Sequence, residues 1–215
     1  MLLPNPHRHG RVAPSDLPLP GGITPGLVRG RVHELCGPSR MAVALMLLSG
    51  TGGPVIWIAP SWLPERPYAC GLREYLYPGR LVFVQCRRIE DVHWSAEEAL
   101  RSGAAPTVVI EMPSAPSLTP VRRLHLAAET GAEAARLDGR PAPIGLLLLP
   151  GDGGAQGVES RWQASPHPSP SGLLDSEGIA LRLQRQRARA APPSTWIVRR
   201  KPDGTTCASG VSQTP

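Results

Sequence analysis

The sequence predicts a three-layer α/β domain with a mainly parallel sheet and an antiparallel strand pair at its C-terminal edge. Two patterns in the chain of 215 residues lead to this prediction. Short apolar runs alternate with helical patterns, which is typical of parallel strands that are covered on both faces. Near the C-terminus the pattern changes to a strict apolar–polar alternation, which predicts antiparallel strands.

Five apolar segments are the expected strands of the parallel part. They lie at residues 31–36, 54–60, 81–86, 107–112 and 144–150. The second of them, "PVIWIAP", is a continuous apolar run with a proline at each end. Such a run is expected for a strand that is buried on both faces.

Three helices are expected between these strands. Residues 39–49 are apolar all round, as in a helix buried against a sheet. Residues 91–102 form an amphipathic pattern, with Asp91 as the expected N-cap and Gly103 just past the C-terminal end. A third helix is expected to start at Thr119, which precedes a proline in the first helical position.

The expected antiparallel pair consists of residues 179–190 and 194–200, which follow the last parallel strand. The ends of the chain lack periodicity. Residues 1–20 predict a disordered, proline-rich arm, and residues 201–215 predict a disordered tail. The expected core domain therefore spans residues 21–200.

The chain carries a net charge of +6, and Lys201 is its only lysine. Arginine binds phosphates and carboxylates in a planar, bidentate manner, so an anionic partner is one interpretation, and a bias in composition is the other. The four cysteines and six histidines show no metal-ligand spacing, so we expect no metal site. Because the chain lacks a signal pattern and an apolar run of membrane length, we expect a cytoplasmic protein without membrane contact.

The segment before the first helix has the place of a phosphate-binding loop but lacks its chemistry. Such a loop needs the pattern GxxxxGK[ST], whereas this chain has Gly37, Pro38, Ser39 and Arg40 with no second glycine and no lysine. Pro38 also has no N–H to offer a phosphate. We therefore expect no ATPase activity and no ATP or magnesium cofactor. The weaker alternative is an NTPase that uses Arg40 in an unconventional loop.

Glu111 ends an apolar strand, where a magnesium-binding acid of an ATPase would stand. Without a phosphate cradle, a structural carboxylate facing solvent or an arginine is the preferred interpretation. The glycine-rich segment 150–157 also follows a strand. It predicts a loop that binds a ligand or DNA, and a plain connector is the alternative.

Arginines are concentrated near the C-terminus, with no acid between Arg182 and Asp203. The candidate DNA-binding residues are Arg182, Arg185, Arg187, Arg189, Arg199 and Arg200. In a regular strand, residues 185, 187 and 189 share one face, so their guanidinium groups are expected to form a row. A row of this kind fits a phosphate backbone, and a charged edge strand that resists aggregation is the alternative.

Two sets of segments carry a resemblance to known families. The stretch "GGITPGLVRGRVHELCG" resembles the start of RecA-type recombinase cores, and "PVIWIAP", "LVFVQC" and "IGLLLLPG" follow in the same order. The combination with "RRLHLAAETG" and "SRWQASP" resembles the ImuA (SulA-like) proteins of bacterial mutagenesis cassettes. The resemblance covers about residues 21–200 and implies a RecA-like core.

The resemblance also implies a function. ImuA-type proteins are accessory factors of SOS-induced translesion DNA synthesis, and they act with an ImuB-like Y-family polymerase homologue and an error-prone DNA polymerase. RecA and DNA are further partners to consider. By position, Gly37 and Pro38 match the first residues of the RecA phosphate loop, Glu111 matches its Walker B acid, and Gly151 to Gly157 match a DNA-contacting loop. The leading hypothesis is a catalytically silent RecA-like scaffold, and a DNA-binding module is the alternative.

Overall fold

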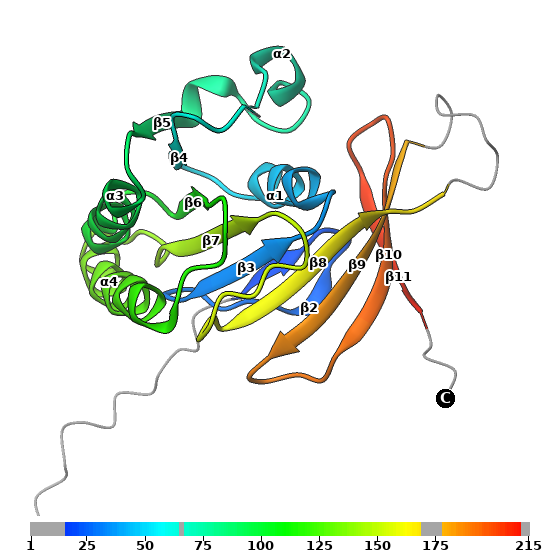
Figure 1. The fold of residues 1–215 in the computed structure, drawn as a ribbon. Helices are drawn as coiled ribbons and strands as arrows, with labels where there is room; N and C mark the ends of the chain where they lie inside the picture. Colours follow the sequence, from blue (N-terminus) through cyan, green and yellow to red (C-terminus); the bar gives the residue numbers. More distant parts are fainter. Residues whose placement is uncertain (1–15, 65–66, 169–177, 212–215) are drawn as a thin grey trace, which may run out of the picture.

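The computed structural model describes residues 16–64, 67–168 and 178–211 (Figure 1). Within them, nine strands form one sheet in the order β11-β10-β9-β8-β3-β7-β6-β4-β5. The strands are β3 (Val32–Cys36), β4 (Val55–Pro60), β5 (Leu81–Cys86), β6 (Thr107–Glu111), β7 (Ile144–Leu149), β8 (Ser160–Pro166), β9 (Ile179–Ala188), β10 (Ser194–Arg200) and β11 (Thr206–Val211). The predicted α/β fold class is confirmed.

The sheet has a parallel part and an antiparallel part, as the sequence predicts. The strands from β8 to β5 in this order pair in parallel with one another. The strands β8, β9, β10 and β11 are joined by antiparallel pairing. We call the strands β8 to β11 the wing. The wing is larger than the predicted pair, because β8 and β11 belong to it as well.

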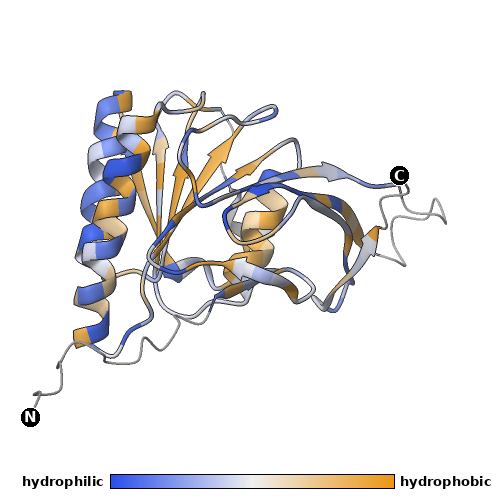
Figure 2. Cartoon of the chain, turned by 90° about the horizontal axis from the view of Figure 1, so that it is seen from below, coloured by the Kyte–Doolittle hydropathy of each residue, from blue (hydrophilic) through white to orange (hydrophobic). Residues whose placement is uncertain are grey.

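Helices and a hairpin cover the two faces of the sheet, which gives three layers (Figure 1). The helix α1 (Arg40–Ser49) lies on one face, and α3 (Ile89–Ser102) and α4 (Leu118–Leu137) lie together on the other. Two short elements, α2 (Ala69–Leu72) and the 3-10 helix η1 (Pro78–Arg80), lie between β4 and β5. Figure 2 shows α1 as mostly hydrophobic, which agrees with its place in the core on this face of the sheet.

The hairpin consists of β1 (Leu17–Leu19) and β2 (Ile23–Leu27). Its apolar side chains share one core with α1 and with Leu181, Leu183 and Val198 of the wing. The hairpin therefore covers the inner face of the wing, the face that α1 also contacts. The outer face of the wing lies on the side of α3 and α4, but these helices lie over the parallel strands instead (Figure 1).

Both segments that were predicted to be disordered contain a strand. The prediction for residues 1–20 is wrong at β1, whose Leu17 and Leu19 are buried. The prediction for residues 201–215 is wrong at β11, which pairs along its whole length with β10. Both strands are short and gain their order from tertiary contacts that local propensity does not reveal. Residues 1–15 and 212–215 lie outside the described residues.

Two predicted helix starts are also wrong, by three residues for α3 and by two residues for α4. The N-cap of α3 is Arg88, so Asp91 lies in the first turn, where its charge still favours the helix dipole. The N-cap of α4 is Ser117, and Pro120 is tolerated because first-turn N–H groups have no partner within the helix. The predicted end of α3 is confirmed, since Gly103 adopts the left-handed conformation.

Candidate functional site

The turn between β3 and α1, where a phosphate loop would lie, packs against β8. Gly37 has a φ of 91°, and a Cβ at this position would collide with the carbonyl oxygen of Ala164. The same oxygen accepts the N–H of Ser39 at 3.1 Å. The N–H and the Nη1 of Arg40 both donate to the carbonyl of Gly37, at 3.3 and 3.2 Å. The backbone N–H groups of Ser39 and Arg40 are thus bonded to the protein itself.

Glu111 lies at the end of β6 and is buried, with 5% of its surface exposed. Its carboxylate accepts a hydrogen bond from the indole N–H of Trp57 on β4. Of the two environments expected for this structural carboxylate, solvent or an arginine, solvent is wrong. The bond to Trp57 joins two neighbouring strands of the parallel part, from the middle of β4 to the carboxyl end of β6.

The glycine-rich segment 150–157 is bonded to Glu34, a residue that the sequence analysis did not single out. The Glu34 carboxylate is fully buried on β3 and accepts the N–H groups of Gly154 at 2.8 Å and Ala155 at 3.0 Å. Arg161 on β8 donates its Nε–H to the same carboxylate at 2.8 Å. Gly153 passes so close that a Cβ there would overlap the carboxylate. A single acid within the apolar strand "VHELC" was the one signal for this anchor.

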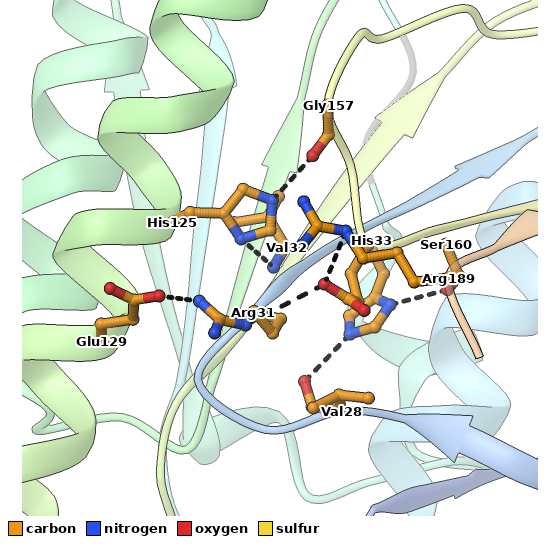
Figure 3. Close-up of polar contacts among 10 residues, drawn as sticks. Val28, Arg31, Val32, His33, His125, Glu129, Gly157, Ser160 and Arg189 are labelled. Atoms are coloured by element: carbon orange, nitrogen blue, oxygen red, sulfur yellow. Dashed lines mark hydrogen bonds and ion pairs between the residues drawn. The ribbon is translucent and has the colours of Figure 1, made fainter.

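A second buried polar residue on β3 is His33. Its Nδ1 lies 2.7 Å from the hydroxyl oxygen of Ser160, and its Nε2 lies 3.0 Å from the carbonyl oxygen of Val28 (Figure 3). Burial lowers the pKa of His33 to about 4. In the neutral ring the Nε2–H donates to Val28 and Nδ1 accepts from Ser160, so both nitrogens are satisfied. His33 is a structural core residue, with no access for a substrate.

Charged residues gather between α4 and the ends of β3 and β9 (Figure 3). Arg31 pairs with Glu129 of α4, and its Nε lies 3.9 Å from the carboxylate of Glu159. Arg189 lies on the other side of Glu159, with its Nε 3.6 Å from the Glu159 carboxylate. These residues line a hollow of about 360 Å³.

His125 of α4 also lines this hollow. Its Nε2–H donates to the carbonyl of Gly157 at 3.1 Å, and its Nδ1 accepts the N–H of Val32 at 3.4 Å (Figure 3). Burial lowers the pKa of His125 to about 4, and Arg31 and Arg189 act in the same direction. The imidazole therefore joins α4 to β3 and to the glycine-rich segment as a neutral group.

Two of the six candidate DNA-binding arginines are buried in the inner face of the wing. Arg185 is 4% exposed and lies over the rings of Trp162 and Trp196, with its guanidinium carbon 5.4 and 5.0 Å from their centroids. Arg200 is 8% exposed, lies 4.2 Å from the centroid of Tyr75, and donates to the carbonyl of Glu74. Both guanidinium groups bind protein and are unavailable to a phosphate.

The predicted row of Arg185, Arg187 and Arg189 is wrong, because β9 contains a β-bulge. Trp162 of β8 pairs with Arg185, but the next pair is Arg161 with Arg187, so Gln186 is the extra residue. Cross-strand partners share a face, and Arg161 and Trp162 face opposite ways. Arg187 therefore lies on the outer face of the wing, opposite Arg185.

The outer face also holds Arg182 and Arg199. Arg182 pairs with Ser165 of β8 and Ile197 of β10, whereas Arg199 pairs with Cys207 of β11. Arg182 and Arg187 are exposed, and Arg199 is half-buried. Within residues 16–64, 67–168 and 178–211, none of the three makes a side-chain hydrogen bond or ion pair. The structure thus divides the six arginines into an inner pair, an outer group of three, and Arg189 in the hollow.

In the described part of the chain, no three histidine, cysteine, aspartate or glutamate side chains are grouped as metal ligands. Burial raises the pKa of Cys36 to about 12, and all four cysteines are free thiols. Among the described helices, none combines the length and the apolar character that crossing a membrane requires.

Comparisons with known proteins give no family assignment. No family model matches the chain, and no curated protein is similar to it. Among solved structures, the crystal structure of SulA from Pseudomonas aeruginosa is similar to part of the chain, with a TM-score of 0.43 and 22% sequence identity. The match covers 56% of this chain and 98% of that one. A likeness at this level supports no statement about function.

Proposed function

We propose that this protein is a non-enzymatic accessory factor of SOS-induced translesion DNA synthesis, acting in the cytoplasm through contacts with other proteins. The partners we propose are an ImuB-like Y-family polymerase homologue and an error-prone DNA polymerase, with RecA as a further candidate. The sequence resemblance to ImuA-type proteins is the basis for the pathway and the partners. The structure supports the part of the proposal that concerns the lack of enzymatic activity.

The proposed lack of enzymatic activity rests on the hydrogen bonds of the turn at residues 37–40. A phosphate loop works because several backbone N–H groups point at the ligand. Here the N–H groups of Ser39 and Arg40 donate to carbonyls of Ala164 and Gly37, and Pro38 has none. A triphosphate would have to displace β8 from this turn. These hydrogen bonds support the proposal that the protein uses no nucleotide cofactor.

The position of Glu111 supports the same proposal. An acid that holds magnesium must present its oxygens to the ion. The Glu111 carboxylate is buried, and the Trp57 indole N–H donates to one of its oxygens. This bond gives the carboxylate a structural role that is independent of a metal.

The test is reconstitution of the complex. The full chain and the ImuB-like protein of the same genome would be co-expressed and analysed by size-exclusion chromatography. We expect co-elution as a stoichiometric complex, which then binds the error-prone polymerase. Separate elution at concentrations of about 10 µM, well above a typical specific Kd, would overturn the proposal. A homologue of the partner from an unrelated repair pathway serves as the control.

A second candidate function is direct DNA binding through the arginines near the C-terminus. One observation favours it, namely that Arg182, Arg187 and Arg199 lie on the outer face of the wing without a described partner. The two functions are compatible, since an accessory factor of DNA synthesis works at a primer–template.

A further inference from the structure

We propose that the outer face of the wing binds the phosphate backbone of duplex DNA through Arg182, Arg187 and Arg199. This inference rests on the second candidate function and gives it a defined surface and a defined form of DNA. It replaces the row of three arginines that the sequence predicted along β9.

The register spreads the three guanidinium groups over the wing. Arg182 and Arg187 are five residues apart on β9, which corresponds to roughly 16 Å at about 3.3 Å per residue. Arg199 lies on the next strand, two residues from Ile197, the partner of Arg182. The three charges therefore extend over a length comparable to about five nucleotides of one DNA strand, at 3.4 Å for each.

The charge of the face fits a polyanion. On the outer face of β8 to β11, no acidic side chain stands among the residues that the structure describes. Asp152 lies at its border and accepts a hydrogen bond from Gln163 at 2.7 Å. Arg161 is paired with Glu34 and adds no net charge. The three outer arginines are left as the uncompensated charge of this face.

Amide side chains lie between these arginines. Gln186 donates to the carbonyl oxygen of the Gln163 side chain at 2.9 Å, and Gln163 pairs across the strands with Gln184. Glutamine side chains commonly donate to phosphate oxygens, which orients a protein on DNA without reading its sequence. We therefore expect binding that depends little on the base sequence.

The aromatic residues decide between duplex and single-stranded DNA. Proteins that bind single strands provide aromatic rings on which bases stack. Trp162 and Trp196 lie on the inner face, where they pack against Arg185. The outer face of the wing shows no aromatic ring in the described ranges. A face with cations and amides but no stacking platform fits the backbone of a duplex.

The experiment is a fluorescence-anisotropy titration of the full chain against a labelled duplex and against one of its single strands. It compares the wild type with the triple variant Arg182→Gln/Arg187→Gln/Arg199→Gln between about 50 and 200 mM salt. We expect the variant to bind the duplex on the order of tenfold to a hundredfold more weakly. The slope of log K against log salt should fall in magnitude by about 0.9 for each arginine removed.

A matched control removes the same charge elsewhere. Arg73, Arg87 and Arg136 are exposed, do not lie on the outer face of the wing and have no described side-chain partner. The triple glutamine variant at these positions should keep the wild-type slope. A triple lysine variant of the outer arginines should retain most of the affinity, because non-specific phosphate contacts depend mainly on charge.

Three results would overturn the inference. They are an unchanged slope in the outer triple variant, an equal loss in the control variant, and tighter binding of the single strand than of the duplex by the wild type. Thermal unfolding of each variant by circular dichroism confirms that the loss is not one of folding. None of these results affects the complex with the ImuB-like protein, so the two proposals fail independently.

Discussion

The carboxylate of Glu34 on β3 accepts the Nε–H of Arg161 on β8 at 2.8 Å, and Glu34 is fully buried. The same carboxylate binds two amides of the glycine-rich segment. One acid therefore holds together the first parallel strand, the first strand of the wing and the loop between β7 and β8. In α/β proteins ligands bind at the carboxyl ends of the parallel strands. Here, protein groups take up part of this region.

Glu34→Ala should destabilise the fold by about 3–5 kcal/mol, because it leaves the Arg161 guanidinium and two amides without their acceptor in a buried site. The measurement is the free energy of unfolding in urea. Glu98→Ala removes an exposed carboxylate that pairs with Arg101 on α3, and it should cost less than about 1 kcal/mol. Similar losses for the two variants would contradict the structural role of Glu34.

Gly37→Ala should also be destabilising, by roughly 1–3 kcal/mol, because its φ of 91° disfavours a side chain and the added Cβ would collide with Ala164. Gly52→Ala is the matched control, since a Cβ at Gly52 meets nothing within 4 Å. The control should change stability by less than about 0.5 kcal/mol. An equal effect at both positions would show that the turn is not packed on β8.

Arg185 and Arg187 provide a test of the β-bulge. Arg185→Ala should lower stability by about 1–3 kcal/mol and alter the tryptophan fluorescence, because Arg185 is buried against the rings of Trp162 and Trp196. Arg187→Ala should leave both quantities nearly unchanged, since its side chain is exposed on the other face. If the two variants exchanged these properties, the register of β9 would be wrong.

Stability should fall as the pH decreases from 6.5 to 4. The pKa of His33 is about 4 in the folded protein and 6.5 in the unfolded chain, so the unfolded chain binds more protons between these values. The His33 imidazole therefore contributes roughly 3 kcal/mol to the free energy of unfolding above pH 6.5, and this contribution is lost as the pH falls to 4.

The pH dependence can be assigned by removing one imidazole. The pKa of His125 is also about 4, so this residue acts in the same direction as His33. The variant His125→Gln should show a shallower dependence of unfolding free energy on pH than the wild type. Identical slopes would mean that His125 is protonated in the folded protein over this range.

The sequence was sufficient for the parallel half of the fold. Strands such as β4 and β7 are continuous apolar runs, and α1 is apolar all round, so burial on both faces determines their structure. The C-terminal half was harder to predict. β11, with the sequence "TCASGV", has almost no apolar pattern and is a strand because it pairs with β10.

The sites could be predicted only in part. The lack of a phosphate-loop pattern is visible in the residues from Gly37 to Arg40, because it depends on residue types at fixed spacing. The role of Glu34 depends on Arg161, which is 127 positions away, and no local pattern links them. The bulge at Gln186 is equally hidden, since the alternation of β9 continues through it in the sequence.

The central claim, a protein without nucleotide chemistry, is tested most directly by isothermal titration of the full chain with MgATP, followed by an assay of phosphate release. We predict no saturable heat of binding up to about 1 mM nucleotide, which corresponds to a binding free energy weaker than about −4 kcal/mol. We also predict no phosphate release above the uncatalysed background. Saturable binding in the micromolar range, with turnover that is lost in Glu111→Gln, would contradict the claim.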